Sequence, residues 1–449
     1  MSDRVGRYYN QSVDKAWIYS FDIENKQLSQ ILEFNGLQQF LDPVISPDNR
    51  YIAFTYDAEN PLFTFMTSLG LIDTKSNTII RLTEQLKLIF PKWSNDGNLI
   101  YALRDYGAYR QIYSINSKTK EISQITDASL NIEDYAISSN GSQLAWIGQD
   151  CHGKMIIRVA TNYGKNVRDI AVTPVAAEDM ALSEVREIDW SVPNHTENMR
   201  GLLVLPLDYK PNKRYPLIVD IHGGGPGAHI WLRGGILVNS PLEWQLWAAK
   251  GYAVFIPEFR SSSAFGSLYI VKETPDLIND DISDIIAGVD ELISKGIIDS
   301  NRMGVIGHSA GCRRVNWLIV STHKFKTALS KEGWADEWFM SGAEERNIIY
   351  SIYGGHPILA PKNYQKNSSL FHASHATTPT LFLMGNPKVG GIDQYNTVRW
   401  LYFALKAQGI RAEYIQYPDE GHNFERLANQ RDALERAIKW FDEHLNSVI

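Results

Sequence analysis

The chain has 449 residues, which exceeds one ordinary domain and indicates two or three. Hydrophobic residues make up 44% and charged residues 21%, close to the globular average, which excludes a disordered chain, a collagen-like fibre and a disulfide scaffold. The 44 basic residues face 51 acidic ones, for a net charge of -7, so we expect no nucleic-acid partner.

Only two cysteines occur, Cys151 and Cys312, and they lie far apart without a CxxC or Cys/His cluster. We therefore expect no metal site, no cofactor and a reducing compartment. The N-terminus lacks the apolar core of a signal peptide, and no run of about 18 apolar residues appears. The expectation is a cytoplasmic protein without a membrane span.

The first part of the chain alternates short apolar and polar runs and repeats itself. SPDNRYIAF begins at Ser46, SNDGNLIYA at Ser94 and SSNGSQLAW at Ser138, so the starts are 48 and 44 residues apart. Hairpin-like segments begin at Ile18, Leu69 and Ile112. About four strands per repeat is typical of a β-propeller blade. We predict a small propeller-like domain of about four blades over residues 1–180; a β-sandwich is the alternative.

Residues 181–449 alternate nearly all-apolar strands with amphipathic helices, which predicts a doubly wound, mainly parallel α/β sheet. Strands are expected in seven segments: GLLVLPL, PLIVDIHG, AVFIPEF, MGVIG, TALSKEG, TPTLFLMG and AEYIQYPD. The last helix is expected to place Leu434, Ile438, Phe441 and Leu445 on one face.

The segment Gly307-His308-Ser309-Ala310-Gly311 follows a predicted strand and precedes a predicted helix. This is the GxSxG nucleophile elbow of α/β hydrolases in the required context, so Ser309 is the candidate nucleophile. The alternative is a tight strand–helix turn that needs small residues.

The glycine-rich stretch 222–227 follows another predicted strand. A backbone N–H there, represented by Gly224, is expected to form an oxyanion hole with the N–H of Ala310. His422 follows the last predicted strand, where this fold keeps its catalytic base. A flexible loop and a surface histidine are the respective alternatives, and His222 is expected to be structural.

Residues from about 185 to 449 resemble the catalytic domain of the prolyl oligopeptidase family. The resemblance rests on segments 222–227, 251–254, 259–262, 281–284, 297–311, 353–357, 378–385 and 417–424. Family members carry an N-terminal β-propeller that restricts access to short peptides. About 180 residues hold fewer blades than these relatives usually have.

The family usually has its triad Asp three residues after the glycine that ends the strand TPTLFLMG, and here Lys388 holds that place. Asp393 is the nearest carboxylate in this loop and our leading candidate, while Glu332 after the preceding strand is the alternative.

The elbow also departs from the family's GxSYGG, which brings Cys312 next to it as a small packed residue. By the same resemblance, Trp334, Trp338 and Phe339 are expected to line the substrate pocket, although core packing would account for them equally.

The motifs and the resemblance together imply a serine hydrolase that cleaves short peptides or acylated amino acids through an acyl-enzyme on Ser309. An esterase, or an acyltransferase or cyclase in a peptide pathway, would use the same intermediate. A decayed, peptide-binding protein is the third hypothesis. The oligomeric state, including a homo-oligomer, stays open.

Overall fold

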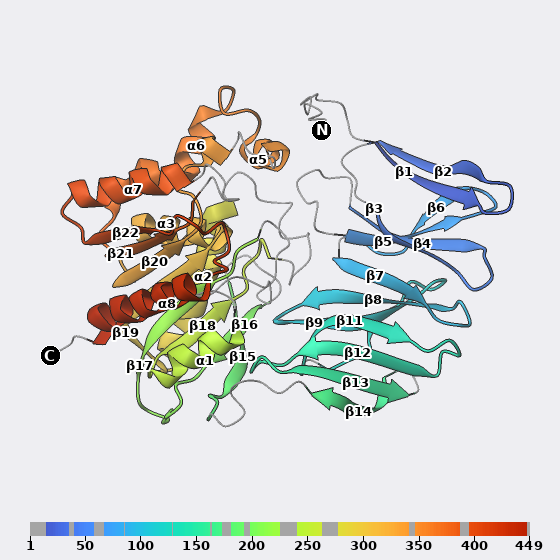
Figure 1. Cartoon of the computed structure of the whole chain (residues 1–449), viewed down its shortest axis with the longest axis horizontal. Helices are drawn as coiled ribbons and strands as arrows, with labels where there is room; N and C mark the ends of the chain where they lie inside the picture. The colour runs from blue at the N-terminus through green and yellow to red at the C-terminus, as the bar shows by residue number, and fades with distance from the viewer. Residues whose placement is uncertain are drawn as a thin grey trace.

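The computed structural model describes residues 15–35, 40–57, 67–84, 86–127, 129–161, 164–172, 181–192, 198–224, 240–262, 277–340, 346–386 and 395–446. These residues form two parts, a row of small antiparallel sheets and an α/β part with one large sheet (Figure 1). The predicted fold class is therefore confirmed. The predicted boundary at residue 180 lies outside the described residues.

The first part contains one hairpin and three four-stranded sheets, each with its strands in sequence order. The strands are β1 (Lys15–Asp22), β2 (Gln27–Asn35), β3 (Phe40–Ile45), β4 (Tyr51–Asp57), β5 (Thr67–Asp73), β6 (Thr78–Arg81), β7 (Leu88–Trp93), β8 (Leu99–Tyr106), β9 (Tyr109–Asn116), β10 (Ile122–Gln124), β11 (Asn131–Ile137), β12 (Gln143–Gln149), β13 (Met155–Thr161) and β14 (Lys165–Val172).

The repeated polar turns have one geometry in all three four-stranded sheets. The hydroxyl groups of Ser46, Ser94 and Ser138 each donate to the Asp or Asn two residues later, at 2.6, 2.6 and 2.8 Å. Each hydroxyl oxygen also accepts the backbone N–H five residues later. These side-chain bonds fix the turn between the first two strands of each sheet, which explains why the motif recurs.

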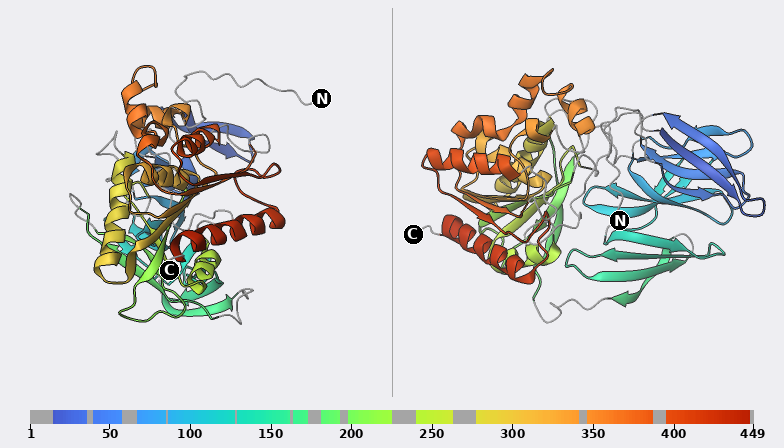
Figure 2. Two further views of the ribbon diagram at one scale, coloured as in Figure 1. Left: turned by 90° about the vertical axis from the view of Figure 1, so that its left-hand side faces the viewer. Right: turned by 45° about the horizontal axis from the view of Figure 1, so that its top comes forward.

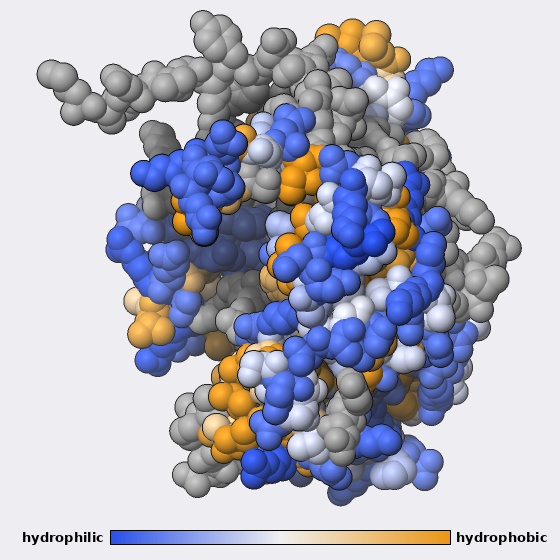
Figure 3. Space-filling view, turned by 90° about the vertical axis from the view of Figure 1, so that its right-hand side faces the viewer, coloured by the Kyte–Doolittle hydropathy of each residue, from blue (hydrophilic) through white to orange (hydrophobic). Residues whose placement is uncertain are grey.

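Hydrogen bonds from the first strand of one sheet reach the first or second strand of the sheet before it. The indole N–H of Trp93 on β7 donates to the carbonyl of Val44 on β3, at 2.9 Å. The hydroxyl of Tyr135 on β11 donates to the carbonyl of Tyr101 on β8, also at 2.9 Å. Figure 3 views the molecule from the side of the small sheets and shows a mainly hydrophilic surface with separate hydrophobic areas.

The second part is built on an eight-stranded sheet with the order β15-β16-β18-β17-β19-β20-β21-β22. Its strands are β15 (Val185–Trp190), β16 (Met199–Val204), β17 (Tyr215–Ile221), β18 (Ala253–Pro257), β19 (Ile298–His308), β20 (Thr327–Lys331), β21 (Thr380–Met384) and β22 (Ala412–Gln416). From β18 to β22 neighbouring strands pair in parallel, whereas β15, β16 and β18 pair antiparallel. The seven predicted strands are confirmed, and β15 is an additional one.

Helices cover both faces of this sheet (Figure 1; Figure 2 shows the same layers from two further sides). They are α1 (Pro241–Ala249), α2 (Leu277–Ser294), α3 (Ala310–Ser321), α4 (Glu337–Met340), α5 (Arg346–Tyr353), α6 (Pro361–Asn367), α7 (Tyr395–Ala407) and α8 (Leu427–Phe441), with 3₁₀ and π turns at Ser369–His375 and Asp442–Asn446. No helix in the described ranges is long and apolar enough to cross a membrane.

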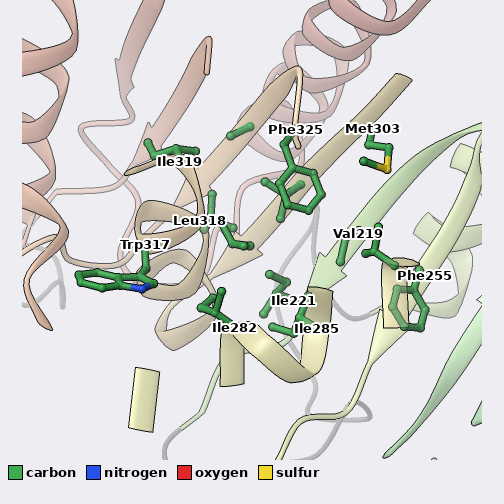
Figure 4. Close-up of a cluster of buried hydrophobic side chains, with 14 of the residues drawn as sticks. Val219, Ile221, Phe255, Ile282, Ile285, Met303, Trp317, Leu318, Ile319 and Phe325 are labelled. Atoms are coloured by element: carbon green, nitrogen blue, oxygen red, sulfur yellow. The ribbon is translucent and has the colours of Figure 1, made fainter. Parts of the chain in front are cut away.

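The larger core lies between the sheet and helices α2 and α3 (Figure 4). Val219 and Ile221 of β17 and Ile285 of α2 are buried there. The second core lies on the opposite face, where α1 and α8 pack. Because both faces are covered, the inner strands are apolar at nearly every position, which is the pattern visible in the sequence.

Phe441 anchors α8 to the second core, and the predicted apolar face of this helix is confirmed in part. Phe441 and Leu445 are buried, whereas Leu434 and Ile438 are only partly buried against the same core. The Phe441 ring is fully buried, and its centroid lies 5.4 Å from that of Trp247. A Cβ added at Gly304 on β19 would stand 2.6 Å from the Phe441 ring, so the ring packs directly on this strand. The glycine therefore admits the aromatic ring to the second core.

We expect Phe441→Ala to lower the free energy of unfolding by about 3–5 kcal/mol, because it leaves a cavity between α8 and the sheet. Leu427→Ala, at an 82% exposed position of the same helix, should change it by less than about 0.5 kcal/mol. Urea titrations of both variants provide the measurement. Equal effects would contradict the assigned core face.

Candidate active site

Ser309 stands alone between the end of β19 at His308 and the start of α3 at Ala310. Its backbone has φ 59° and ψ -123°, a conformation that costs an L-residue about 1–3 kcal/mol. Its N–H donates to the carbonyl of Lys331 on the neighbouring strand, at 3.0 Å. The strand–turn–helix context predicted for the elbow is therefore present, and the serine is held at its tip.

The glycines around Ser309 are needed because backbone passes close on two sides. A Cβ at Gly307 would stand 2.6 Å from the carbonyl carbon of Gly311, and a Cβ at Gly311 would collide with the carbonyl oxygen of Ile221. A Cβ at Gly223 would stand 2.7 Å from the carbonyl oxygen of His308 and 3.0 Å from the Cβ of Ser309. The glycine-rich loop therefore lies directly against the elbow.

This arrangement suits an oxyanion hole. Gly224 has φ +86°, in the left-handed region that favours glycine. Ala310 is the first residue of a twelve-residue helix, whose initial N–H groups have no partner within the helix. Such groups and the helix dipole attract negative charge. Residues 225–227 of the loop lie outside the described residues.

His222 anchors the start of the glycine-rich loop. Its side chain is buried, its Nε2 lies 3.2 Å from Oε2 of the equally buried Glu258, and its ring stacks on Phe259 at 4.4 Å. The Arg314 guanidinium of α3 lies over the same Phe259 ring, 4.1 Å from its centroid. Packing therefore connects the glycine-rich loop to helix α3, which begins directly after Ser309.

His422 lies in the loop between β22 and α8, which Glu420 holds in shape. The Glu420 carboxylate accepts the backbone N–H groups of Glu425 and Arg426, at 2.7 and 3.0 Å, and the Asn429 amide at 2.7 Å. Burial opposes ionisation of Glu420, but these hydrogen bonds outweigh it and lower its pKa. The loop is therefore well ordered around a charged carboxylate.

The carboxylate that faces His422 belongs to Glu332, which follows β20. Its side chain is fully buried, and its Oε2 lies 3.8 Å from Nδ1 of His422. Neither atom has a hydrogen-bond partner among the described residues, whereas Oε1 of Glu332 accepts the N–H of Gly385. The leading sequence candidate, Asp393, and also Lys388 lie outside the described residues.

Asp419 is directed away from this pair. Its carboxylate binds Arg426 at 3.1 Å on the surface, with both side chains more than half exposed. Closeness in sequence therefore does not bring it to the imidazole.

The predicted pocket residues follow β20. The indole N–H of Trp334 donates to Glu337, at 3.0 Å, and the ring packs against a small cluster that includes Met340 and Tyr353. Trp338 and Phe339 are 38% and 40% exposed. Their role in a pocket stays a prediction.

Cys312 is a buried, packed residue, as expected. Its Sγ lies 2.8 Å from the hydroxyl of Ser330, and burial raises the pKa of the thiol to about 12. It is therefore not a nucleophile. Within the described ranges no group of three or more His, Cys, Asp or Glu side chains could hold a metal ion.

Lys331, which sequence reasoning missed, is buried beside the site. Its Nζ has no hydrogen-bond partner among the described residues and lies 4.6 Å from the ring centroid of Phe424. Burial lowers its pKa to about 8, against the opposing effect of the carboxylates of Glu332, Glu243 and Glu420. The signal in the sequence was a charged residue, Lys331, inside the predicted strand TALSKEG.

The site combines a serine on a strained strand–helix turn, a glycine-rich loop against it, and a histidine that faces a buried carboxylate. This is the arrangement typical of α/β hydrolases of the serine type. Residues 239–448 match the profile described as "Prolyl oligopeptidase family". The resemblance inferred from the motifs is thereby confirmed for this segment.

The chain is also similar in sequence to individual peptidases. The chain is 30% identical over 275 residues to an uncharacterized peptidase of Bacillus subtilis, a match that covers 58% of this chain and 40% of the relative. It is 22% identical to dipeptidyl-peptidase 5 of Porphyromonas gingivalis, with 93% of this chain and 61% of the relative covered. The chain thus spans about half the length of these relatives.

A solved structure supports the fold of the whole chain. Acylaminoacyl peptidase of Pyrococcus horikoshii superimposes with a TM-score of 0.77 at 16% identity, covering 100% of this chain and 69% of that one. The likeness therefore includes the row of small sheets as well as the hydrolase part.

Lys331 should make stability depend on pH. Its lowered pKa means that the folded chain loses this proton near pH 8, whereas the unfolded chain keeps it until about pH 10.5. The cost of burying the charge is thus present below pH 8 and disappears as the pH rises toward 10.5. Between pH 7 and 10 the wild type should gain roughly 2 kcal/mol relative to Lys331→Met.

Urea unfolding of both proteins at the two pH values provides the measurement. Lys439→Met, which replaces a side chain that is 79% exposed, should show no such difference. Parallel stability curves for wild type and Lys331→Met would contradict a charged, buried Lys331 at pH 7.

Proposed function

We propose that the chain is a serine peptidase that cleaves short peptides or acylated amino acids through an acyl-enzyme on Ser309. The observation that carries the proposal is the pair formed by Glu332 and His422. A buried carboxylate and a partly exposed imidazole stand 3.8 Å apart, each without another hydrogen-bond partner at the facing atom among the described residues. Such contacts shorten when substrate binds.

In this mechanism the Ser309 hydroxyl oxygen attacks the substrate carbonyl carbon while Nε2 of His422 takes the hydroxyl proton. The new oxyanion accepts N–H groups of Ala310 and of the loop at Gly224. The tetrahedral intermediate collapses, and the imidazolium gives its proton to the departing amine. Water, activated by the same imidazole, then attacks the acyl-enzyme and releases the acid and free Ser309.

Glu332 is the proposed third member of the triad. Its carboxylate accepts the Nδ1 proton of His422, which fixes the tautomer that presents Nε2 to the serine, and it stabilises the imidazolium. The Gly385 N–H on its other oxygen holds the carboxylate in place. This assignment replaces Asp393 as our leading candidate and accounts for Lys388 at the position where the family usually has its acid.

The substrate proposal rests on the names of two relatives, dipeptidyl-peptidase 5 of Porphyromonas gingivalis and acylamino-acid-releasing enzyme 1 of Oryza sativa subsp. japonica. The aromatic side chains of Trp334, Trp338 and Phe339 are the proposed lining of the acyl pocket. Residues 1–180 are proposed as the propeller domain that limits access, and 181–449 as the catalytic domain.

The proposed compartment is the cytoplasm. Both cysteines are free, and burial raises the pKa of Cys151 to about 11, so neither thiol is poised for oxidation.

A fluorophosphonate probe should label the wild type and not Ser309→Ala, because the probe reacts with an activated serine. Ser321→Ala, at the exposed end of α3, should label like the wild type. Mass spectrometry of the labelled peptide identifies the site. Absence of labelling in folded wild-type protein would refute the serine mechanism.

Glu332→Gln should lower kcat on an acyl-peptide anilide roughly 10³- to 10⁴-fold, because an amide can stabilise the wrong imidazole tautomer. It keeps an oxygen for the Gly385 N–H, so the thermal midpoint should change little. Asp393→Asn should stay within about threefold of wild type by the same reasoning. A large loss of kcat in Asp393→Asn with little loss in Glu332→Gln would instead assign Asp393 as the acid of the triad.

A further inference from the structure

The residue before the nucleophile contacts the base. His308, the last residue of β19, is buried, and its Nε2 lies 2.9 Å from the main-chain oxygen of His422, 114 positions later. The two imidazole rings also pack together, with centroids 4.6 Å apart and planes inclined by 31°. One side chain thus joins the strand that ends at Ser309 to the loop that carries His422.

The chemistry of this contact fixes the state of His308. A carbonyl oxygen only accepts hydrogen bonds, so Nε2 of His308 must carry the proton and donate it. The charged form is disfavoured, because burial, the nearby Lys331 ammonium and His422 hold the pKa of His308 well below its usual value. His308 is therefore a neutral, permanent donor and not a proton carrier.

The neighbourhood of His308 makes this donor hard to move. Its backbone pairs with Lys331 in the parallel ladder between β19 and β20. The Cβ that Gly223 lacks would meet the carbonyl oxygen of His308 at 2.7 Å, so the oxyanion loop packs on the same residue. The backbone of His308 is thus held between β20 and the glycine-rich loop.

The other supports of the His422 loop act at a distance from His422 itself. The N–H of Tyr417 donates to Met384 at 2.8 Å, and that of Asn386 donates to the Glu420 carbonyl at 2.6 Å. The bond from His308, by contrast, reaches the peptide unit of His422. Because an error of about 1 Å in placing a catalytic group can cost 100-fold in rate, a support at this atom has direct consequences.

We propose that His308 is a positioning residue, which sets the distance between His422 and Ser309 by hydrogen-bonding the main-chain carbonyl of His422. The inference rests on the proposed function, since it assigns His422 as the base. It adds a fourth side chain to the catalytic machinery without contact to substrate. Nothing in the GxSxG pattern itself requires a donor at this position, which in the motif is any residue.

The test compares two substitutions of similar size. His308→Gln keeps an N–H donor at about the same reach, whereas His308→Met fills the space without one. We expect Met to lower kcat about 10- to 100-fold with KM unchanged, and to slow phosphonylation of Ser309 by the fluorophosphonate equally. Gln should restore both rates to within about threefold of wild type.

A purely structural role would lower the thermal midpoint of both variants and leave kcat of the folded fraction intact, and this result would overturn the proposal. Equal loss in Gln and Met, with wild-type folding, would also overturn it, because the donor would then be irrelevant. If wild type itself is not labelled, the serine mechanism fails. If wild type and Met are labelled at the same rate, only the positioning role fails.

Discussion

The strained backbone at Ser309 is the constraint on which the rest of the site depends. An L-residue at φ 59° and ψ -123° persists only where its surroundings over-determine it. Here the surroundings are β19 on one side, α3 on the other and the Lys331 carbonyl that accepts the Ser309 N–H. The turn exposes one hydroxyl at the end of a buried strand, next to helix N–H groups.

The same constraint explains the composition around the elbow. Gly223, Gly307 and Gly311 are places where a Cβ would meet backbone atoms of a neighbouring segment. Side chains that do fit there are held by specific partners, such as His222 by Glu258 and Cys312 by Ser330. Tight main-chain packing thus brings the glycine-rich loop against Ser309, and specific polar contacts hold the side chains around it.

Periodicity and motifs predicted the two parts of the fold, seven strands of the large sheet and the setting of Ser309. These features depend on local patterns, which a sequence displays directly. The partners of His422 were predicted only in part, because Glu332 was named as the alternative to Asp393 and the contact with His308 was not predicted. Glu332 and His308 reach His422 because β19, β20, β21 and β22 lie side by side, and no local pattern encodes that juxtaposition.

The charged residues at the strand ends were the available signal. Lys331 ends β20 and Glu332 follows it, both buried, and a buried charge is costly unless the fold uses it or pairs it. A family template, by contrast, directs attention to the loop after β21, where Lys388 replaces the usual acid. The acid proposed here therefore comes from the preceding strand, one position away in the sheet.

The central claim is that Glu332 orients His422 toward Ser309, and a crystal structure of the fluorophosphonate adduct tests it most directly. The account predicts phosphorus bonded to Oγ of Ser309, and Nδ1 of His422 within about 3.2 Å of Oε2 of Glu332. A structure in which Nδ1 of His422 contacts Asp393, with Glu332 turned away, would contradict it.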